Sequence, residues 1–125
     1  MSSSTKRPIV LLLEGVRLRA AMAGVLGRAN FEVIEVQNSA EALQTLEARE
    51  DVDVLLADID AAGAGDGLEL SRCVHARWPW LGLVLTSEWV RRLSPDDVPG
   101  DGCFLPHPVP ADTLLNEVRQ AARHP

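Results

Sequence analysis

The chain has 125 residues, of which 46% are hydrophobic and 24% charged, and its mean hydropathy is +0.03. These values are typical of a single soluble globular domain and exclude a disordered chain. The formal net charge of −6 disfavours direct binding to nucleic acid, because duplex affinity depends on clustered Lys and Arg side chains.

We expect no secretion signal and no membrane anchor at the amino terminus. Its apolar run "IVLLL" is far shorter than the roughly 18 to 20 residues that span a bilayer. The preceding Lys6 and Arg7 have no small-residue cleavage site after them. We therefore expect a cytoplasmic protein without membrane contact, in which residues 1–7 are a flexible tail and residues 8–125 form one domain.

The first half of the chain alternates short apolar runs with segments of helical period. This pattern predicts a strand over 9–13 and a helix over 16–28. "FEVIEV" over 31–36 alternates apolar and acidic residues, which is typical of a strand at the edge of a sheet. Asn38 and Glu41 have the spacing of a capping box and predict the start of a second helix.

The second half continues the alternation. The unbroken apolar run in "VDVLLADID" predicts the central strand, and a glycine-containing loop leads from it to a helix over 66–77. "LGLVLT" predicts the fourth strand and "CFL" the fifth, followed by a helix that begins near Pro110. Between the last two strands, Pro95, Pro99 and Gly100 limit any helix to a turn or two around "EWVRRL".

Strands that alternate with helices in this way predict an α/β fold, a (βα)5 doubly wound parallel five-stranded sheet. In such a sheet the ligand crevice lies beyond the carboxyl ends of the strands. Glu14, Asp58 and Thr86 stand at the ends of the first, third and fourth strands, and His107 stands near the end of the fifth. Converging carboxylates suit Mg²⁺, and a carboxylate beside such a cation can accept a phosphoryl group.

Four stretches of the chain resemble a bacterial two-component response regulator receiver domain, with similarity over nearly all of residues 8–124. They are "IVLLLEGVRLRAAMAGVL", "VDVLLADIDAAGAGDGLEL", "RWPWLGLVLTSE" and "FLPHPVPADTLL". The resemblance implies a flavodoxin-like receiver fold and a role in signal transduction. It also implies a histidine kinase or phosphotransfer protein upstream and a protein partner downstream.

The resemblance assigns a role to each polar residue at the crevice. Asp58 is the aspartate that receives phosphate, and Thr86 is the hydroxyl that moves toward that phosphate. Phe104 is the aromatic residue whose rotamer follows the threonine. Glu14, Asp58 and Asp60 hold Mg²⁺, the last through its backbone carbonyl.

The chain departs from the family at the end of the first strand, where a pair of acidic residues is expected. Counting back from Phe31 without a gap puts Glu14 on the second acid and Leu13 on the first. A one-residue deletion would instead put Glu14 on the first acid and Gly15 on the second. Either way one carboxylate is missing, and we expect a weakened affinity for Mg²⁺.

A second departure is His107, which stands where the family has a nearly universal lysine that contacts the phosphoryl oxygens. Pro108 follows it, at a position where the family commonly has a cis peptide. An imidazole with an ordinary pKa near 6.5 is mostly neutral at neutral pH. Losing one charge-assisted hydrogen bond, worth roughly 1.5 to 3 kcal/mol, would weaken the activated state about tenfold to a hundredfold.

Plainer interpretations stay open for several of these residues. Asp60 also fits a solvated or phosphate-repelling carboxylate, and Glu88 would repel phosphate if it pointed inward. Thr86 could simply cap a helix, and His107 could be a polar residue tolerated after the lysine became unnecessary. Trp89 is a candidate partner contact.

Two hypotheses follow. In the first, Asp58 is a phosphoacceptor switch that signals by protein contact. In the second, the chain is a divergent pseudo-receiver that binds partners without phosphorylation. We expect no enzymatic activity, since no Gly-rich phosphate loop follows the first strand to suggest a cofactor enzyme. The sequence leaves open whether the weak fourth helix and the last helix form the face of a homodimer or no such face.

Overall fold

A computed structural model describes residues 7–60 and 66–123 of the chain. The expected tail over residues 1–7 lies outside this part except for Arg7. Residues 61–65 of the expected glycine-containing loop lie outside it as well.

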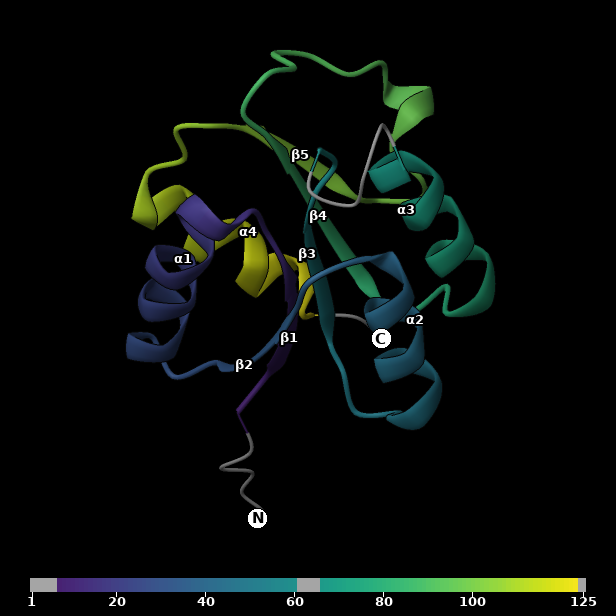
Figure 1. Cartoon of the computed structure of the whole chain (residues 1–125), viewed down its shortest axis with the longest axis horizontal. Coiled ribbons are helices and arrows are strands. Elements are labelled where there is room, and N and C mark those ends of the chain that lie inside the picture. Colours follow the sequence, from purple (N-terminus) through teal and green to yellow (C-terminus); the bar gives the residue numbers. More distant parts are fainter. Residues whose placement is uncertain (1–6, 61–65, 124–125) are drawn as a thin grey trace.

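Five parallel strands form one sheet in the order β2-β1-β3-β4-β5 (Figure 1). In chain order they are β1 (Ile9–Leu13), β2 (Glu32–Val36), β3 (Val54–Asp58), β4 (Gly82–Ser87) and β5 (Cys103–Pro106). The central strand is β3 and one edge strand is β2, as the apolar run of the first and the alternating acids of the second predict. The predicted α/β doubly wound fold class is therefore confirmed.

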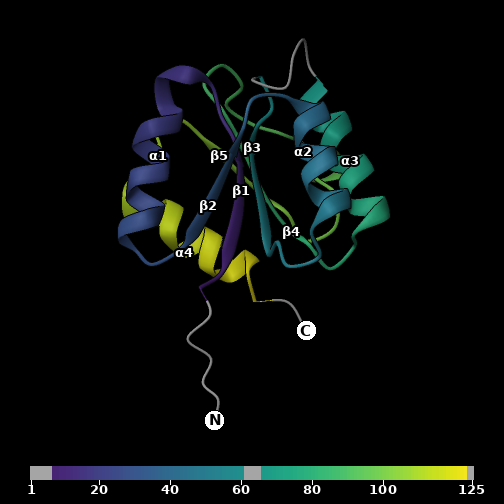
Figure 2. The ribbon, with the colours of Figure 1, turned by 60° about the horizontal axis from the view of Figure 1, so that its bottom comes forward.

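Four α-helices cover the two faces of the sheet. Helices α1 (Val16–Arg28) and α4 (Ala111–Ala121) lie on one face, and α2 (Ser39–Ala48) and α3 (Asp66–Arg77) lie on the other (Figure 2). Within the described residues, none of these helices combines the length and the apolar character that crossing a bilayer requires.

Successive strand residues point to opposite faces, and this alternation divides the core into two clusters. Val10 and Leu12 of β1 pack with α1 and α4, whereas Leu11 and Leu13 pack with α2 and α3. All four side chains are fully buried. Burial of each such side chain contributes about 1.5 to 3 kcal/mol, so the sheet is held rigidly between its two helical layers.

The start of α2 follows the predicted capping pattern with one difference. The Asn38 side chain accepts a hydrogen bond from the Glu41 backbone N–H at 2.9 Å. The Glu41 carboxylate in turn accepts from the N–H of Gln37, at 2.8 Å, rather than from that of Asn38. Both contacts satisfy backbone donors at the helix entrance.

The expected fourth helix around "EWVRRL" is not present. Residues 88–94 form neither a helix nor a strand, and a short 3₁₀-helix (Pro95–Asp97) follows them. Ser94 caps that turn with its side chain and its backbone, while Pro99 and Gly100 prevent a continuation. The chain thus passes from β4 to β5 through an irregular segment and one 3₁₀ turn rather than through an α-helix.

Candidate functional site

The carboxyl ends of four strands bring the predicted polar residues into one buried cluster. Glu14 follows β1, Asp58 ends β3, and Thr86 lies opposite Asp58 in the β3–β4 register. The Thr86 hydroxyl donates to Glu14 Oε2 at 2.6 Å, and His107 Nε2 lies 3.6 Å from the same oxygen. Glu14, Asp58 and Thr86 are 2%, 4% and 0% exposed, so this cluster is shielded from bulk water.

Glu14 is held in its neutral form at neutral pH. Burial raises the pKa of its carboxyl to about 8, and the nearby Asp58 carboxylate pushes it in the same direction. The hydrogen bond from Thr86 opposes this shift but does not cancel it. Glu14 Oε1 is buried and has no hydrogen-bond partner among the described residues. Because Oε2 already accepts the Thr86 hydroxyl, the proton of the neutral carboxyl belongs on Oε1, which needs an acceptor.

Asp58 is a buried carboxyl group whose position is fixed by a backbone hydrogen bond. Its Oδ1 accepts the backbone N–H of Asp60 at 2.7 Å, which fixes the carboxyl at the end of β3. Burial raises the pKa of Asp58, and the hydrogen bond from Asp60 works against that rise. The side chain is oriented but less readily ionised than an exposed aspartate.

His107 contributes no fixed positive charge to the cluster. Burial lowers its pKa, so the imidazole is neutral at neutral pH although Asp58 partly offsets the shift. Its 3.6 Å approach to Glu14 is close enough for an ion pair, but both groups are neutral and the contact is not one. His107 Nε2 is buried and has no hydrogen-bond partner in the part of the chain that the structure describes, and the His107–Pro108 peptide is cis.

Ser87 is a part of the site that our reading of the sequence missed. It is fully buried, and its hydroxyl donates to Asp60 Oδ2 at 2.7 Å. The Ser87 hydroxyl oxygen itself accepts the backbone N–H groups of Trp89 at 3.1 Å and Val90 at 2.8 Å. A serine directly after Thr86 at the end of a buried strand was the available signal.

The rim of the site is set by charged side chains. Glu88 does not point freely into the mouth, since its carboxylate pairs with Arg17 at 3.0 Å. Arg91 donates to the backbone carbonyl of His107 and so ties the segment between β4 and β5 to the residue that follows β5. Trp89 is 79% exposed at this rim.

Phe104 belongs to β5 and lies beside Leu85 in the β4–β5 register. It is partly buried and packs against the core cluster beneath α2 and α3.

Glu14 and Asp58 are the residues of the site that could ligate a magnesium ion, as a reduced set of ligands. Both side chains are buried carboxyl groups. Leu13 is buried in the core, so it leaves no third carboxylate at the end of β1. Among the described residues, no group of three or more His, Cys, Asp or Glu side chains is arranged to hold a metal. Mg²⁺ tolerates such a site because it retains several waters.

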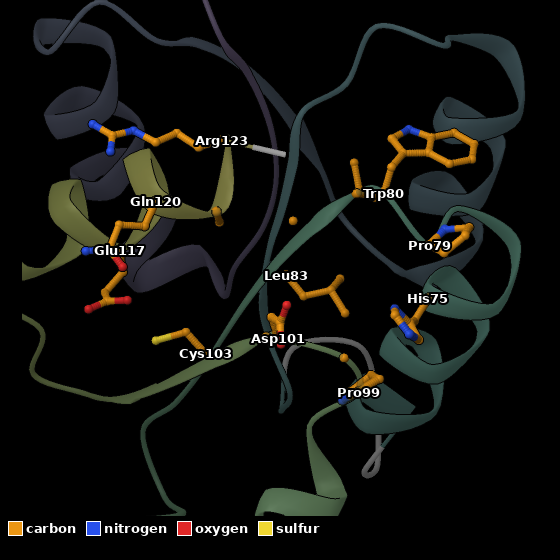
Figure 3. Close-up of a pocket in the computed structure, with 15 residues that line it drawn as sticks. His75, Pro79, Trp80, Leu83, Pro99, Asp101, Cys103, Glu117, Gln120 and Arg123 are labelled. Atoms are coloured by element: carbon orange, nitrogen blue, oxygen red, sulfur yellow. The ribbon is translucent and has the colours of Figure 1, made fainter. Parts of the chain in front are cut away.

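A separate cavity of about 400 Å³ lies at the opposite end of the sheet, where β4 and β5 begin (Figure 3). His75 and Trp80 line one side of it, and Glu117 of α4 lines the other. Burial, with a hydrogen bond to Glu117, raises the pKa of the Cys103 thiol in this cavity to about 12. The thiol stays protonated, which disfavours nucleophilic chemistry there.

No protein-family model and no curated protein sequence matches the chain, whereas solved structures do. A response regulator from Thermotoga maritima is 22% identical, with a TM-score of 0.79 over 94% of this chain and 98% of that one. A response regulator receiver protein from Sinorhizobium medicae WSM419 is 22% identical, with a TM-score of 0.82 over 94% and 95%.

A CheY-like receiver domain protein from Methanospirillum hungatei JF-1 is 17% identical, with a TM-score of 0.77 over 93% of each chain. The strand order and the two helical layers indicate the same fold as these structural superpositions. The chain has the fold of response regulator receiver domains.

Proposed function

We propose that the chain is a signal-transduction receiver module in which Asp58 accepts a phosphoryl group from a histidine kinase or a phosphotransfer protein. An Asp58 carboxylate oxygen attacks phosphorus, and the phosphorus–nitrogen bond of the donor breaks. The freed imidazole of the donor takes up a proton. The chain is a substrate of this transfer rather than an enzyme, and its output is contact with a downstream protein.

The observation that carries the proposal is the position of Asp58. It ends the central strand, and its carboxyl is held by the Asp60 N–H at 2.7 Å. Two further groups suited to phosphoryl oxygens, Thr86 and His107, come from the neighbouring strand ends. A solvated surface acid would not need this alignment.

Mg²⁺ is the cofactor that we propose for the transfer. Glu14, Asp58 and the backbone carbonyl of Asp60 would hold it, and when bound it would neutralise charge on the incoming phosphoryl oxygens. Glu14 must lose its proton to serve as a ligand, and its pKa of about 8 opposes that loss at neutral pH. We therefore expect a weak site and slow phosphorylation.

The test is labelling by a small phosphodonor, acetyl phosphate, in the presence of Mg²⁺. Intact-mass spectrometry should show the addition of one phosphoryl group to the wild type and none to Asp58→Asn. The matched control is Asp53→Asn, because Asp53 precedes the same strand at its other end and accepts the backbone N–H of Ile9. Absence of labelling in the wild type, or equal labelling of Asp58→Asn, contradicts the proposal.

A pseudo-receiver that binds partners without phosphorylation is the second candidate, and the Glu14–Thr86 contact favours it. The hydroxyl that would move toward a phosphate already donates to a buried neutral acid at 2.6 Å. Under this alternative, binding to a cognate partner survives Asp58→Ala. Loss of binding by a folded Asp58→Ala protein excludes it.

A further inference from the structure

We propose that Ser87 is a positioning residue that couples the state of Asp58 to the chain segment after β4, in addition to any movement of Thr86. This inference rests on the proposed function of Asp58 and deepens it, because it names the path by which occupancy of the site reaches the surface. It concerns a serine that the resemblance to receiver domains leaves without a role.

A continuous series of hydrogen bonds connects Asp58 to the exposed rim. Asp58 Oδ1 accepts the backbone N–H of Asp60 at 2.7 Å, and Asp60 Oδ2 accepts the Ser87 hydroxyl at 2.7 Å. The Ser87 oxygen accepts the N–H groups of Trp89 at 3.1 Å and Val90 at 2.8 Å. The series therefore joins the phosphoacceptor position to the segment that carries the 79% exposed Trp89.

The orientation of the Ser87 hydroxyl is fully determined. A hydroxyl has one proton to donate and two lone pairs with which to accept. Here two backbone N–H groups occupy the lone pairs, and the proton goes to Asp60. Ser87 is 0% exposed, so water does not offer a replacement partner. Moving any one partner must disturb the others.

A phosphoryl group on Asp58 acts directly on the first hydrogen bond of the series, which joins Asp58 to the backbone N–H of Asp60. A phosphoryl group adds about 1.5 to 2 negative charges and strong acceptor oxygens. The Asp60 N–H now donates to a carboxylate oxygen of Asp58, and the Asp60 carboxylate repels the added charge. Both effects shift Asp60 and remove the acceptor that orients Ser87.

The segment after β4 is able to respond because little regular structure holds it. Residues 88–94 belong to no helix or strand, and Ser87 provides the hydrogen bonds that begin the segment. Thr86 is less free, since its buried hydroxyl must first leave Glu14. Along the Ser87 path the change begins at Asp60, whose backbone N–H donates directly to Asp58.

The test follows the backbone amide signals of Trp89 and Val90 by NMR in the full chain, with Mg²⁺ and beryllofluoride as the phosphoryl mimic. Fluorine NMR reports binding of the mimic independently. We expect both amides to shift in the wild type, and to shift by less than roughly half as much in Ser87→Ala at saturating mimic. Thr86→Val should retain most of the shift.

Asp60→Ala is the second variant. It removes the acceptor of the Ser87 proton and leaves the serine oxygen free to hold the two amides, so it separates coupling from local folding. It should reduce the shift as Ser87→Ala does. A merely structural role for Ser87 predicts a normal response in Asp60→Ala, and that result would overturn the inference.

If beryllofluoride does not bind, the coupling is tested without a ligand, by introducing Asp58→Asn into the wild-type and the Ser87→Ala proteins. Asp58→Asn changes the charge at the start of the series and should shift both amides in the wild-type background but not in the Ser87→Ala background. Equal shifts in the two backgrounds refute the coupling. A missing fluorine signal for bound mimic counts against the proposed function of Asp58 instead, so the two failures are distinguishable.

Discussion

Replacing Glu14 by Gln should remove a large pH dependence of the free energy of unfolding. In the folded chain the carboxyl has a pKa of about 8, against 4.5 when unperturbed. Between these values the folded state keeps the proton and the unfolded state loses it. Stability from this group is therefore complete below pH 4.5, falls as the pH rises, and is lost above about pH 8.

The size of the effect follows from the two pKa values. Across the whole window it amounts to about 5 kcal/mol at most, since one pKa unit corresponds to about 1.4 kcal/mol. His107 acts with the opposite sign but only below pH 6.5, because its pKa is lowered in the folded state. Cys103 titrates in the unfolded chain near pH 9. Between pH 6.5 and pH 9 the ionisation of Glu14 should reduce the free energy of unfolding by about 2 kcal/mol.

Urea unfolding at pH 6.5 and pH 9 measures this difference. The wild type should lose about 2 kcal/mol between the two conditions, and Glu14→Gln should lose less than about 0.5 kcal/mol. Glu35→Gln is the matched control, because Glu35 is an exposed acid that pairs with Arg19 at the surface and should leave the wild-type loss intact. Equal losses in the wild type and Glu14→Gln would show that Glu14 is ionised in the fold.

Three further substitutions test the site and the packing. His107→Lys should increase the rate of labelling by acetyl phosphate about tenfold to a hundredfold, because it restores a charged hydrogen-bond donor. The control Gln120→Lys, at an exposed position, should leave the rate unchanged. An unchanged rate for His107→Lys argues against a phosphate contact at this position. Leu12→Ala should destabilise the fold by about 2 to 5 kcal/mol in urea unfolding, because the side chain is fully buried, and a loss under about 1 kcal/mol would contradict this core. Gly82→Ala should cost about 1 to 3 kcal/mol, since its Cβ would lie 2.2 Å from the Ala121 carbonyl oxygen, while Gly27→Ala meets no atom within 4 Å and should be neutral or stabilising.

The sequence carried most of the information about the strands. Five short apolar runs with turn residues between them define the sheet, and the acids of "FEVIEV" identify its edge. The ends of those runs also name Glu14, Asp58 and Thr86, because parallel strands deliver their last residues to one edge. These features are local or follow from topology, so a single sequence is sufficient to predict them.

The connection between β4 and β5 could not be assigned from local pattern. "EWVRRL" contains good helix-forming residues, yet the structure has no helix there. The segment is held by contacts from distant parts of the chain, including the ion pair of Glu88 with Arg17 and the bond from Arg91 to the His107 carbonyl. Such contacts override propensity, and their partners lie outside any sequence window.

Protonation and the hydrogen-bond network of the site depended on tertiary structure alone. Glu14 looks like an ordinary ionised acid in the sequence, but 2% exposure and a neighbouring Asp58 raise its pKa to about 8. Ser87 has no motif of its own, and only the packing of two loops against it gives its hydroxyl three partners. The physical reason is that burial and mutual orientation are properties of the assembled chain, whereas strand formation and the positions of strand ends are properties of its local pattern.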